Sequence, residues 1–444
     1  MQDKKKRILI LGGGFAGVKC ARELESTMGG DADVEITMVS EDNFLLFTPM
    51  LPQVASGMIE TRHIVMPIRT ICDRTTFYEG RVKNIDPYGK SVDLWGTREK
   101  RGISITYDFL VLALGSQTNF FGLSDVEKNA YTMKTLGDAV VLRNRVVDML
   151  EQAENETDPI LRGTLLTFVI VGGGFAGIET AGEILDLLLD ARKHYPNIRK
   201  DDFSVVVLEA LGAILPGFDE KLAKFAHEKL LEKGMDIRLR TAVSGFDGTE
   251  VSFKGLDGGG EDAIRTNTLV WTAGVTPVNT IKRSLFKTEK GKIVVDGFLA
   301  VPEFPGVFAV GDCALSVDPG SGRPFPPTAQ LAEAQGETVA HNLQALIRGG
   351  GMKAFTFKQK GQMAVIGKRT GIASFLGANI AGFWAWFLWR NVYLSKIPRM
   401  EKRIRVLLDW TIDLFFDRDI ARMKLFRKSS AVEQRGLDEV DDVW

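Results

Sequence analysis

The hexapeptide GGGFAG occurs twice in this chain, in RILILGGGFAGVKCAREL (7–24) and in TFVIVGGGFAGIETAGEI (167–184). Each copy follows a short apolar run and precedes a stretch whose apolar residues have helical spacing. In the pattern GxGxxG the first glycine permits a tight turn, the second lets a phosphate approach the backbone, and the third lets the helix pack on the strand. We therefore expect two dinucleotide-binding loops, and a strand–helix turn without a ligand is the alternative for each. The loop residues are Gly12, Gly14, Phe15, Ala16 and Gly17, then Gly172, Gly174, Phe175, Ala176 and Gly177.

An acidic residue at the end of the following strand would accept hydrogen bonds from a ribose. In the second copy, FSVVVLEA places Glu209 there, where a carboxylate favours NADH because it repels the 2′-phosphate of NADPH. In the first copy, Ser40 takes the equivalent place and Glu41 follows it. Two dinucleotide sites in one chain are explained if one holds a flavin tightly and the other binds and releases a nicotinamide. Hydride could then pass between the two rings, which indicates an oxidoreductase.

The repeated plan extends beyond the loops. YDFLVLALGSQTNF (107–120) follows the first copy, and NTLVWTAGVTPV (267–278) plays the same part after the second. GVFAVGDCA (306–314) then precedes another helical stretch. We predict an α/β fold in which the second of two Rossmann-like dinucleotide-binding domains is inserted into the first. The expected boundaries are 1–125 and 295–360 for an FAD-binding domain, 126–294 for an NADH-binding domain, 361–428 for a C-terminal membrane-associating region, and 429–444 for a disordered tail.

Composition narrows the classes of function. A net charge of −1 argues against binding to nucleic acid. Three cysteines without a CxxC pair, and four scattered histidines, predict neither a disulfide framework nor a metal site. The basic start is followed by an apolar run too short for a signal peptide, so we expect a chain that is not exported.

Several motifs resemble known flavoproteins. LVLALGS, LVWTAGV and GVFAVGDCA are similar to the turns of the two-dinucleotide-binding flavoprotein disulfide reductase superfamily. NFLLFTPMLPQVASG (43–57), PPTAQLAEAQGETVAHNL (326–343) and the C-terminal stretches 382–394 and 403–422 resemble type II NADH dehydrogenases, the single-chain NADH:quinone oxidoreductases. The resemblance implies FAD as cofactor, NADH as substrate, a membrane quinone as acceptor, and a respiratory-chain enzyme that pumps no protons.

The resemblance also implies functions for individual residues. It makes Glu179 and Gln330 catalytic, with Gln330 and Gln335 as quinone contacts. Ala334 stands where the family has a second glutamine, and Gln335 lies next to it. Besides the first loop, the FAD contacts are Ser40, Glu41, Thr48, Pro49, Ala113, Gly115, Gly311, Asp312, Ala329 and Gln330. Besides the second loop, the NADH contacts are Glu179, Glu209, Ala273 and Gly274.

Further residues have a predicted local role. Thr328 is expected to cap the helix that Ala329 and Gln330 open, and the N-terminus of this helix would stabilise negative charge on the flavin. Glu183 is expected on the helix surface or at an interdomain contact, and Cys313 is expected to pack in the core.

The C-terminal region has the features of a membrane anchor. Residues 372–389 carry no formal charge, and the following segment is rich in lysine and arginine. We favour helices that lie in the plane of an anionic membrane over a spanning helix or a protein interface. The expected location is peripheral on the cytoplasmic face of the cell membrane, or on the inner mitochondrial membrane in a eukaryote, and a homodimer is expected. The residues at helical spacing are Ile404, Leu407, Leu408, Thr411, Ile412 and Phe415.

Other functions remain open on the sequence alone. A sulfide:quinone oxidoreductase would need paired reactive cysteines, which Cys20, Cys72 and Cys313 do not resemble. A soluble NADH reductase for a ferredoxin-like protein fits the hydrophobic C-terminus poorly. A non-catalytic NAD sensor would not oxidise NADH rapidly when quinone is added.

Overall fold

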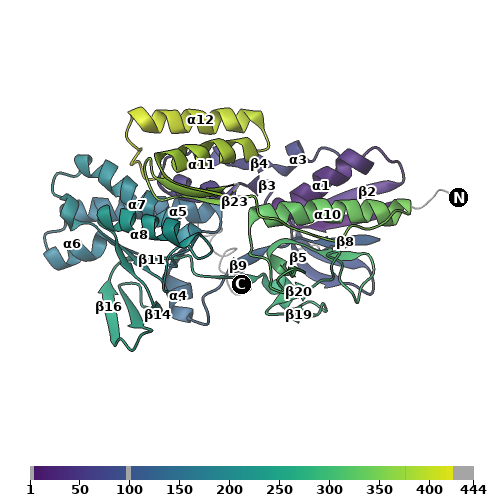
Figure 1. Cartoon of the computed structure of the whole chain (residues 1–444), viewed down its shortest axis with the longest axis horizontal. Helices are drawn as coiled ribbons and strands as arrows, with labels where there is room; N and C mark the ends of the chain where they lie inside the picture. The colour runs from purple at the N-terminus through teal and green to yellow at the C-terminus, as the bar shows by residue number, and fades with distance from the viewer. Residues whose placement is uncertain (1–4, 97–101, 376, 424–444) are drawn as a thin grey trace, which may run out of the picture.

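The computed structural model describes residues 5–96, 102–375 and 377–423, so the predicted disordered tail lies outside the described residues. Two α/β units lie side by side, and the C-terminal helices lie along the top of the view, above the left-hand unit and up to its junction with the other (Figure 1).

The first unit is built on a mixed sheet with the order β21-β8-β1-β2-β5-β6-β7. Strands β21, β8, β1, β2 and β5 run parallel, and β6 and β7 continue antiparallel. Because β21 comes after the whole second unit in the sequence, the chain returns to the first sheet to complete it. The strands are β1 (Lys6–Leu11), β2 (Val34–Ser40), β5 (Thr76–Asp86), β6 (Ser91–Gly96), β7 (Ile103–Thr106), β8 (Phe109–Leu112) and β21 (Val307–Ala309).

The second unit contains a parallel sheet with the order β10-β17-β11-β12-β13. An antiparallel sheet of β14, β15 and β16 packs beside it. This arrangement confirms the predicted fold, in which one Rossmann-like unit is inserted into another. The strands are β10 (Tyr131–Thr132), β11 (Thr167–Val171), β12 (Ser204–Leu208), β13 (Asp236–Arg238), β14 (Thr241–Phe246), β15 (Glu250–Gly255), β16 (Glu261–Arg265) and β17 (Thr268–Trp271).

Glycine makes both strand–helix turns possible. Gly12 and Gly172 have φ of +110° and +107°, in the region that residues with a side chain rarely adopt. A Cβ on Gly17 or Gly177 would overlap the carbonyl oxygen of Gly12 or Gly172. Helices α1 (Phe15–Met28) and α7 (Phe175–Ala191) can therefore start directly above their strands.

The long helix α10 (Ala329–Arg348) packs on α1. A Cβ on Gly336 would overlap the carbonyl oxygen of Ala16, so the two helices touch through backbone at this point. Thr328 caps α10 as predicted, because its hydroxyl accepts from the N–H of Leu331 at 3.2 Å. The contact fixes the N-terminus of α10 relative to the first glycine loop.

The C-terminal part forms an antiparallel sheet of β23 (Gly361–Val365), β24 (Gly371–Phe375) and β25 (Ala378–Gly382), followed by α11 (Phe383–Lys396) and α12 (Met400–Phe415). The uncharged stretch 372–389 is thus divided between strands and a helix. Among the described residues, no helix is both long and apolar enough to cross a membrane. Gly182 on α7 lets this sheet come close, since a Cβ there would lie 3.2 Å from the backbone N of Gly367.

The remaining helices of the described residues connect and cover these sheets. Their bounds are α2 (Leu51–Ala55), α3 (Ile68–Ile71), α4 (Ser124–Asn129), α5 (Leu136–Asn155), α6 (Pro159–Leu165), α8 (Glu220–Glu232) and α9 (Asn279–Lys282). The short strands are β3 (Phe44–Leu46), β4 (Val65–Pro67), β9 (Ser116–Thr118), β18 (Val275–Pro277), β19 (Thr288–Glu289), β20 (Lys292–Val294) and β22 (Ala314–Leu315). Strands β9 and β18 pair antiparallel and join the two units.

The close contact between α1 and α10 predicts that a methyl group added at Gly336 lowers the stability of the fold. Gly336→Ala should lower the free energy of unfolding by about 1–3 kcal/mol, because the helices must separate to admit the Cβ. Gly163→Ala in α6 is the matched control: its Cβ would meet nothing within 4 Å, so it should stabilise by up to about 1 kcal/mol. Denaturant unfolding measures both, and equal stabilities would contradict the contact.

Candidate active site

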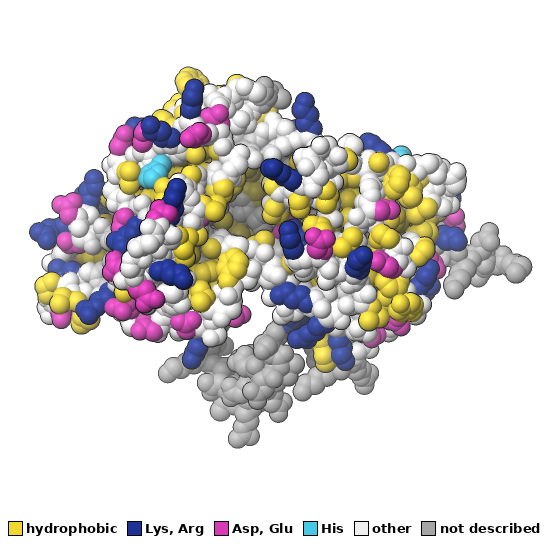
Figure 2. All heavy atoms as spheres, turned by 60° about the horizontal axis from the view of Figure 1, so that its bottom comes forward, with side chains coloured by type: hydrophobic (Ala, Val, Ile, Leu, Met, Phe, Trp, Pro, Cys, Tyr) yellow, Lys and Arg dark blue, Asp and Glu magenta, His cyan; other side chains and the backbone are white. Residues whose placement is uncertain are grey.

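A cavity with a volume of about 560 Å³ lies between the two units. Figure 2 shows the molecule hollowed near the centre of one face. The walls of this cavity come from parts of the chain that are far apart in the sequence. They are the first glycine helix, α2, the second glycine loop, the start of α10, β23 and α11. Of the predicted contacts, the cavity is lined by Phe15, Thr48, Pro49, Gly174, Phe175, Ala176, Gly177, Glu179, Gly274, Asp312, Ala329 and Gln330.

The middle glycines of the loops have open space beside them. A Cβ on Gly14 or Gly174 would meet no protein atom within 4 Å. A Cβ on Gly12 would overlap the Ala113 carbonyl oxygen, and one on Gly172 would crowd the Thr272 hydroxyl at 2.9 Å, and both glycines have a positive φ. The fold therefore requires glycine at the outer position and leaves the middle position free. An open approach to backbone N–H groups at a helix N-terminus fits a pyrophosphate.

The acidic residues after the two loops have different surroundings. Glu209 is buried, and its carboxylate accepts from the backbone N–H groups of Gly173 and Leu211, the latter at 2.7 Å. Glu41 is exposed, and its carboxylate lies 3.4 Å from Nε of Arg81. The side chain of Ser40 faces the first loop, since a Cβ on Gly13 would lie 2.7 Å from its hydroxyl oxygen. The two loops thus have the same backbone conformation, but the acidic residue next to each differs in position and burial.

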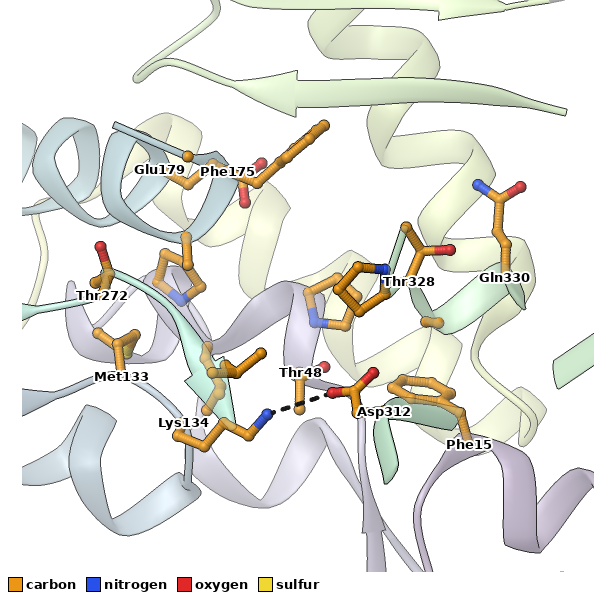
Figure 3. Close-up of a pocket in the computed structure, with 18 of the residues that line it drawn as sticks. Phe15, Thr48, Met133, Lys134, Phe175, Glu179, Thr272, Asp312, Thr328 and Gln330 are labelled. Carbon is orange, nitrogen blue, oxygen red and sulfur yellow. Dashed lines mark ion pairs between the residues drawn. The ribbon is translucent and has the colours of Figure 1, made fainter. Parts of the chain in front are cut away.

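Asp312 is held at the floor of the cavity by a cluster that joins the two units. Its carboxylate accepts from the Ser116 hydroxyl at 2.6 Å and lies 3.8 Å from Nζ of Lys134 (Figure 3). Lys134 also donates to the Ser116 hydroxyl at 2.8 Å. Lys134 follows β10 of the second unit, so no pattern in its own stretch of sequence predicts that it lies beside Asp312.

Gln335 does not line the cavity. Its amide oxygen accepts from the N–H of Gly311 at 2.6 Å, its amide nitrogen donates to the Ser316 hydroxyl at 2.7 Å, and the side chain is 0% exposed. It therefore holds the turn before Asp312, where Gly311 has φ +71°. The neighbouring Ala334 packs partly buried against the core.

Gln330 does lie at the cavity wall, at the N-terminus of α10 (Figure 3). Its amide nitrogen donates to the carbonyl of Gly361 at 3.1 Å, which orients the side chain. An amide NH₂ has two donors, so one remains for a ligand.

Glu179 enters the cavity from the first turns of α7, next to Phe175 (Figure 3). Burial raises its pKa to about 8, while the hydrogen bond that its carboxylate accepts from the N–H of Val365, at 3.0 Å, acts in the opposite direction. A carboxyl group whose pKa is raised in this way can hold a proton and donate it.

The structure adds titratable residues that motif reasoning missed. Glu333, Tyr393 and Lys396 line the cavity near Gln330. Burial raises the pKa of Glu333 and of Tyr393, and lowers that of Lys396. Glu333 and Lys396 stand 63 residues apart in the sequence, on different elements, so only their shared cavity identifies them.

Thiol chemistry has no support at this site. Cys20, Cys72 and Cys313 are buried, and Cys313 packs in the core as predicted. Burial raises the pKa of Cys72 to about 12 and that of Cys313 to about 11, so neither forms a thiolate readily.

Comparisons with known proteins define the class. Residues 6–336 match the model of the pyridine nucleotide-disulphide oxidoreductase family, and residues 359–419 match the NDH2 C-terminal domain. The chain is 34% identical to a probable NADH dehydrogenase of Dictyostelium discoideum, covering 94% of this chain and 91% of that protein. It is 31% identical to the type II NADH:quinone oxidoreductase Ndh of Mycobacterium tuberculosis, covering 92% and 88%.

A solved structure agrees with these relatives. NDH2 from Plasmodium falciparum in complex with NADH has a TM-score of 0.87 and 19% identity, and the match covers 94% of this chain and all of that one. The fold and the family model thus define a pyridine nucleotide-disulphide oxidoreductase. Within that class, the chain belongs to the type II NADH:quinone oxidoreductase family, as its motifs predicted.

The glycine geometry makes a prediction for ligand binding. Gly174→Ala should leave thermal stability unchanged, because its Cβ meets no protein atom, but should weaken NADH binding at least about tenfold by occupying the space of a phosphate. Gly177→Ala should lower stability instead, because its Cβ overlaps the Gly172 carbonyl. Melting temperature and NADH titration separate the two effects, and a stable Gly174→Ala with unchanged NADH affinity would contradict the assignment.

Proposed function

We propose that this protein is an FAD-dependent NADH:quinone oxidoreductase of a respiratory chain that pumps no protons. The observation that carries this proposal is a single cavity bordered by the second glycine loop, the Asp312 turn and the C-terminal sheet and helices. When bound, FAD supplies the redox chemistry that passes two electrons from NADH to a quinone.

The first unit, 1–125 with 295–360, would hold FAD. Its first glycine loop offers backbone N–H groups to the pyrophosphate, with Ser40 and Glu41 near the ribose. Asp312, oriented by Ser116 and Lys134, would accept hydrogen bonds from the cofactor's hydroxyl-bearing chain. The N-terminus of α10 at Ala329 would stabilise negative charge. The other proposed FAD contacts are Thr48, Pro49, Ala113, Gly115, Gly311 and Gln330.

The second unit, 126–294, would bind NADH. Gly172, Gly174 and Gly177 shape the loop for its pyrophosphate. The buried carboxylate of Glu209, already fixed by backbone N–H groups, would accept from the ribose and disfavour NADPH. Ala273 and Gly274 would border the nicotinamide end, since Gly274 lines the cavity.

The quinone would bind beside Gln330, where β23 and α11 close the cavity. NADH oxidation releases two electrons and one proton, while a quinone needs two electrons and two protons. One proton must therefore come from the protein or from solvent. Glu179, with its pKa raised to about 8, is the donor that we assign, and the remaining N–H of Gln330 would bind a quinone oxygen.

Rapid-mixing measurements test this reaction and the role of Glu179. NADH should bleach the flavin absorbance of the protein, and an added quinone should restore it. Glu179→Gln should leave bleaching within about twofold but slow the recovery at least about tenfold, because a proton donor is lost. Recovery in the wild type should slow as pH rises through about 8, since Glu179 then loses its proton. Absence of quinone-dependent recovery would refute the function; an unslowed Glu179→Gln would refute only the donor.

The exposed face of α12 supports a membrane-bound location. Ile404, Leu407, Leu408, Ile412 and Phe415 are all at least half exposed, and all belong to the predicted apolar face. Val406 and Trp410 point the other way, into the core. In α11, Trp384 is 69% exposed while Trp386 and Trp389 are buried.

An amphipathic helix with exposed leucines and flanking basic residues binds anionic lipid in the plane of the membrane. We therefore propose a peripheral location on the cytoplasmic face of a cell membrane, or on the inner mitochondrial membrane in a eukaryote. A quinone dissolved in the bilayer would then reach the cavity near α11. The homodimer stays a prediction.

Vesicle binding tests the anchor. Replacing Leu407 and Leu408 by Ser should reduce binding to phosphatidylcholine–phosphatidylglycerol vesicles roughly 30-fold or more, because two half-exposed leucines no longer enter the lipid. The control replaces Ile160 and Leu161, equally exposed on α6, by Ser and should bind as the wild type does. Cosedimentation measures both, and equal losses in the two variants would contradict an anchor on α12.

A further inference from the structure

A second acidic residue stands one helical turn behind Glu179. Glu183 lies on the same face of α7, since residues four apart on a helix are neighbours. It is only 2% exposed, and one carboxylate oxygen accepts from the Ser56 hydroxyl at 2.7 Å. Of the two predicted locations, helix surface and interdomain contact, the structure confirms the contact, because Ser56 follows α2 of the first unit.

The counterion of Glu183 comes from the C-terminal part of the chain. Nη1 of Arg418 lies 3.1 Å from the Glu183 carboxylate and also donates to the Glu183 backbone carbonyl at 3.2 Å. Nε of Arg418 lies 3.2 Å from Asp413 and 3.8 Å from Asp190. Burial opposes the charge of Arg418, but these carboxylates outweigh it and raise its pKa. A guanidinium buried this deeply requires ionised partners.

Other charged groups surround this cluster from every packed element. Asp186 of α7 pairs with Lys233 after α8, and Asp190 pairs with Lys368 after β23. The guanidinium of Arg390 in α11 lies 3.9 Å from the ring centre of Trp386. Burial lowers its pKa to about 10, while Asp413 and Glu183 favour its charge. Burial raises the pKa of Glu183, and Asp186 and Asp413 add to this effect, while Arg418 and the Ser56 hydroxyl act in the opposite direction. The buried guanidinium of Arg418, 3.1 Å from the Glu183 carboxylate, is the geometric reason to assign a negative charge to Glu183.

A small cavity separates Glu183 from Glu179. Its volume is about 10 Å³, close to the lower limit for one water molecule, and it is lined by both glutamates, Gln53 and Trp389 among others. The second carboxylate oxygen of Glu183 and the indole nitrogen of Trp389 are buried and have no hydrogen-bond partner among the described residues. A water there would have the polar partners it needs.

We propose that Glu183 is a positioning residue for the proton of Glu179. Arg418 holds Glu183 as an anion beside the small cavity, one water molecule joins the two carboxyl groups, and the negative charge of Glu183 keeps the proton on Glu179. The C-terminal segment thereby adjusts the acidity of a group that faces the main cavity. The predicted change in the acidity of Glu179 does not depend on the function proposed above. Only the predicted change in turnover rests on the proposed role of Glu179 as proton donor.

The size of the effect follows from the separation. Side chains four residues apart on a helix lie about 6 Å apart. With an effective dielectric constant of about 20, one charge at that distance shifts the pKa of its neighbour by roughly one to two units. Without the charge on Glu183, Glu179 should release its proton at lower pH. The other titratable groups that line the main cavity with Glu179 are Lys134, Asp312, Glu333, Tyr393 and Lys396.

Infrared titration of the full-length flavoprotein tests the proposal without turnover. The carboxylic acid band of Glu179 is identified as the band that Glu179→Gln removes. In Glu183→Gln, which keeps the shape of the side chain, the band should disappear about one pH unit or more below the wild-type midpoint. Glu183→Asp, which keeps the charge, should restore most of the wild-type midpoint.

Two further variants separate this effect from a general loss of charge. Asp190→Asn removes one negative charge from the same Arg418 cluster, but it lies about three helical turns from Glu179 and should leave the midpoint unchanged. Arg418→Gln should lower the midpoint as Glu183→Gln does, because Glu183 without its cation takes up a proton. A wild-type midpoint in folded Glu183→Gln, or an equal shift in Asp190→Asn, overturns the proposal.

The same shift should appear in the pH dependence of flavin recovery by quinone. An infrared shift without a matching kinetic shift would uphold the link between Glu183 and Glu179 and refute Glu179 as the donor in turnover. The two readouts thus distinguish a failure of this inference from a failure of the proposed function.

Discussion

The buried guanidinium of Arg418 joins three parts of the molecule that are far apart in the sequence. Its side chain is 1% exposed, and its ionised partners come from α7 and α12. Through Glu183 and Ser56 the same cluster reaches the first unit. Breaking a buried ion pair by removing one partner typically costs about 3–5 kcal/mol, so the C-terminal part cannot leave α7 without a large penalty. The C-terminal part is therefore a wall of the cavity as well as a candidate anchor.

This attachment explains the composition of the cavity wall. Val365 of β23 supplies the N–H that Glu179 accepts, Gly361 supplies the carbonyl that orients Gln330, and Tyr393 of α11 closes the same side. Each of these contacts depends on the sheet β23–β25 lying against α7, which Gly182 permits. The residues assigned to the quinone step are thus positioned by the C-terminal part, while Phe15 and the second glycine loop supply other parts of the cavity wall.

Much of the fold and part of the site could be predicted from local patterns. The glycine loops, the cap at Thr328 and the apolar face of α12 follow from spacing along one strand or one helix. The inserted second unit follows from the order of the repeated motifs along the chain. Sequence could not predict that Lys134 would meet Asp312, or that Lys396 would share a cavity with Glu333, because these pairs form only when the units pack. Gln335 illustrates the limit within one helix: it belongs to α10 as Gln330 does, yet Gln330 lines the cavity and Gln335 is buried.

The sequence by itself determined which backbone conformations the strand–helix turns could adopt. Gly12 and Gly172 are required by the positive φ of their turns, and Gly17 and Gly177 by the carbonyl oxygens of Gly12 and Gly172 in the same turn, so these constraints are local. The tertiary structure decided which charges meet. Nothing in the sequence around Glu179 distinguishes it from an ordinary helical glutamate. Its burial, with a smaller contribution from Glu183, raises its pKa to about 8. Burial and charge pairing depend on groups brought together from distant positions, so a single stretch of sequence cannot specify them.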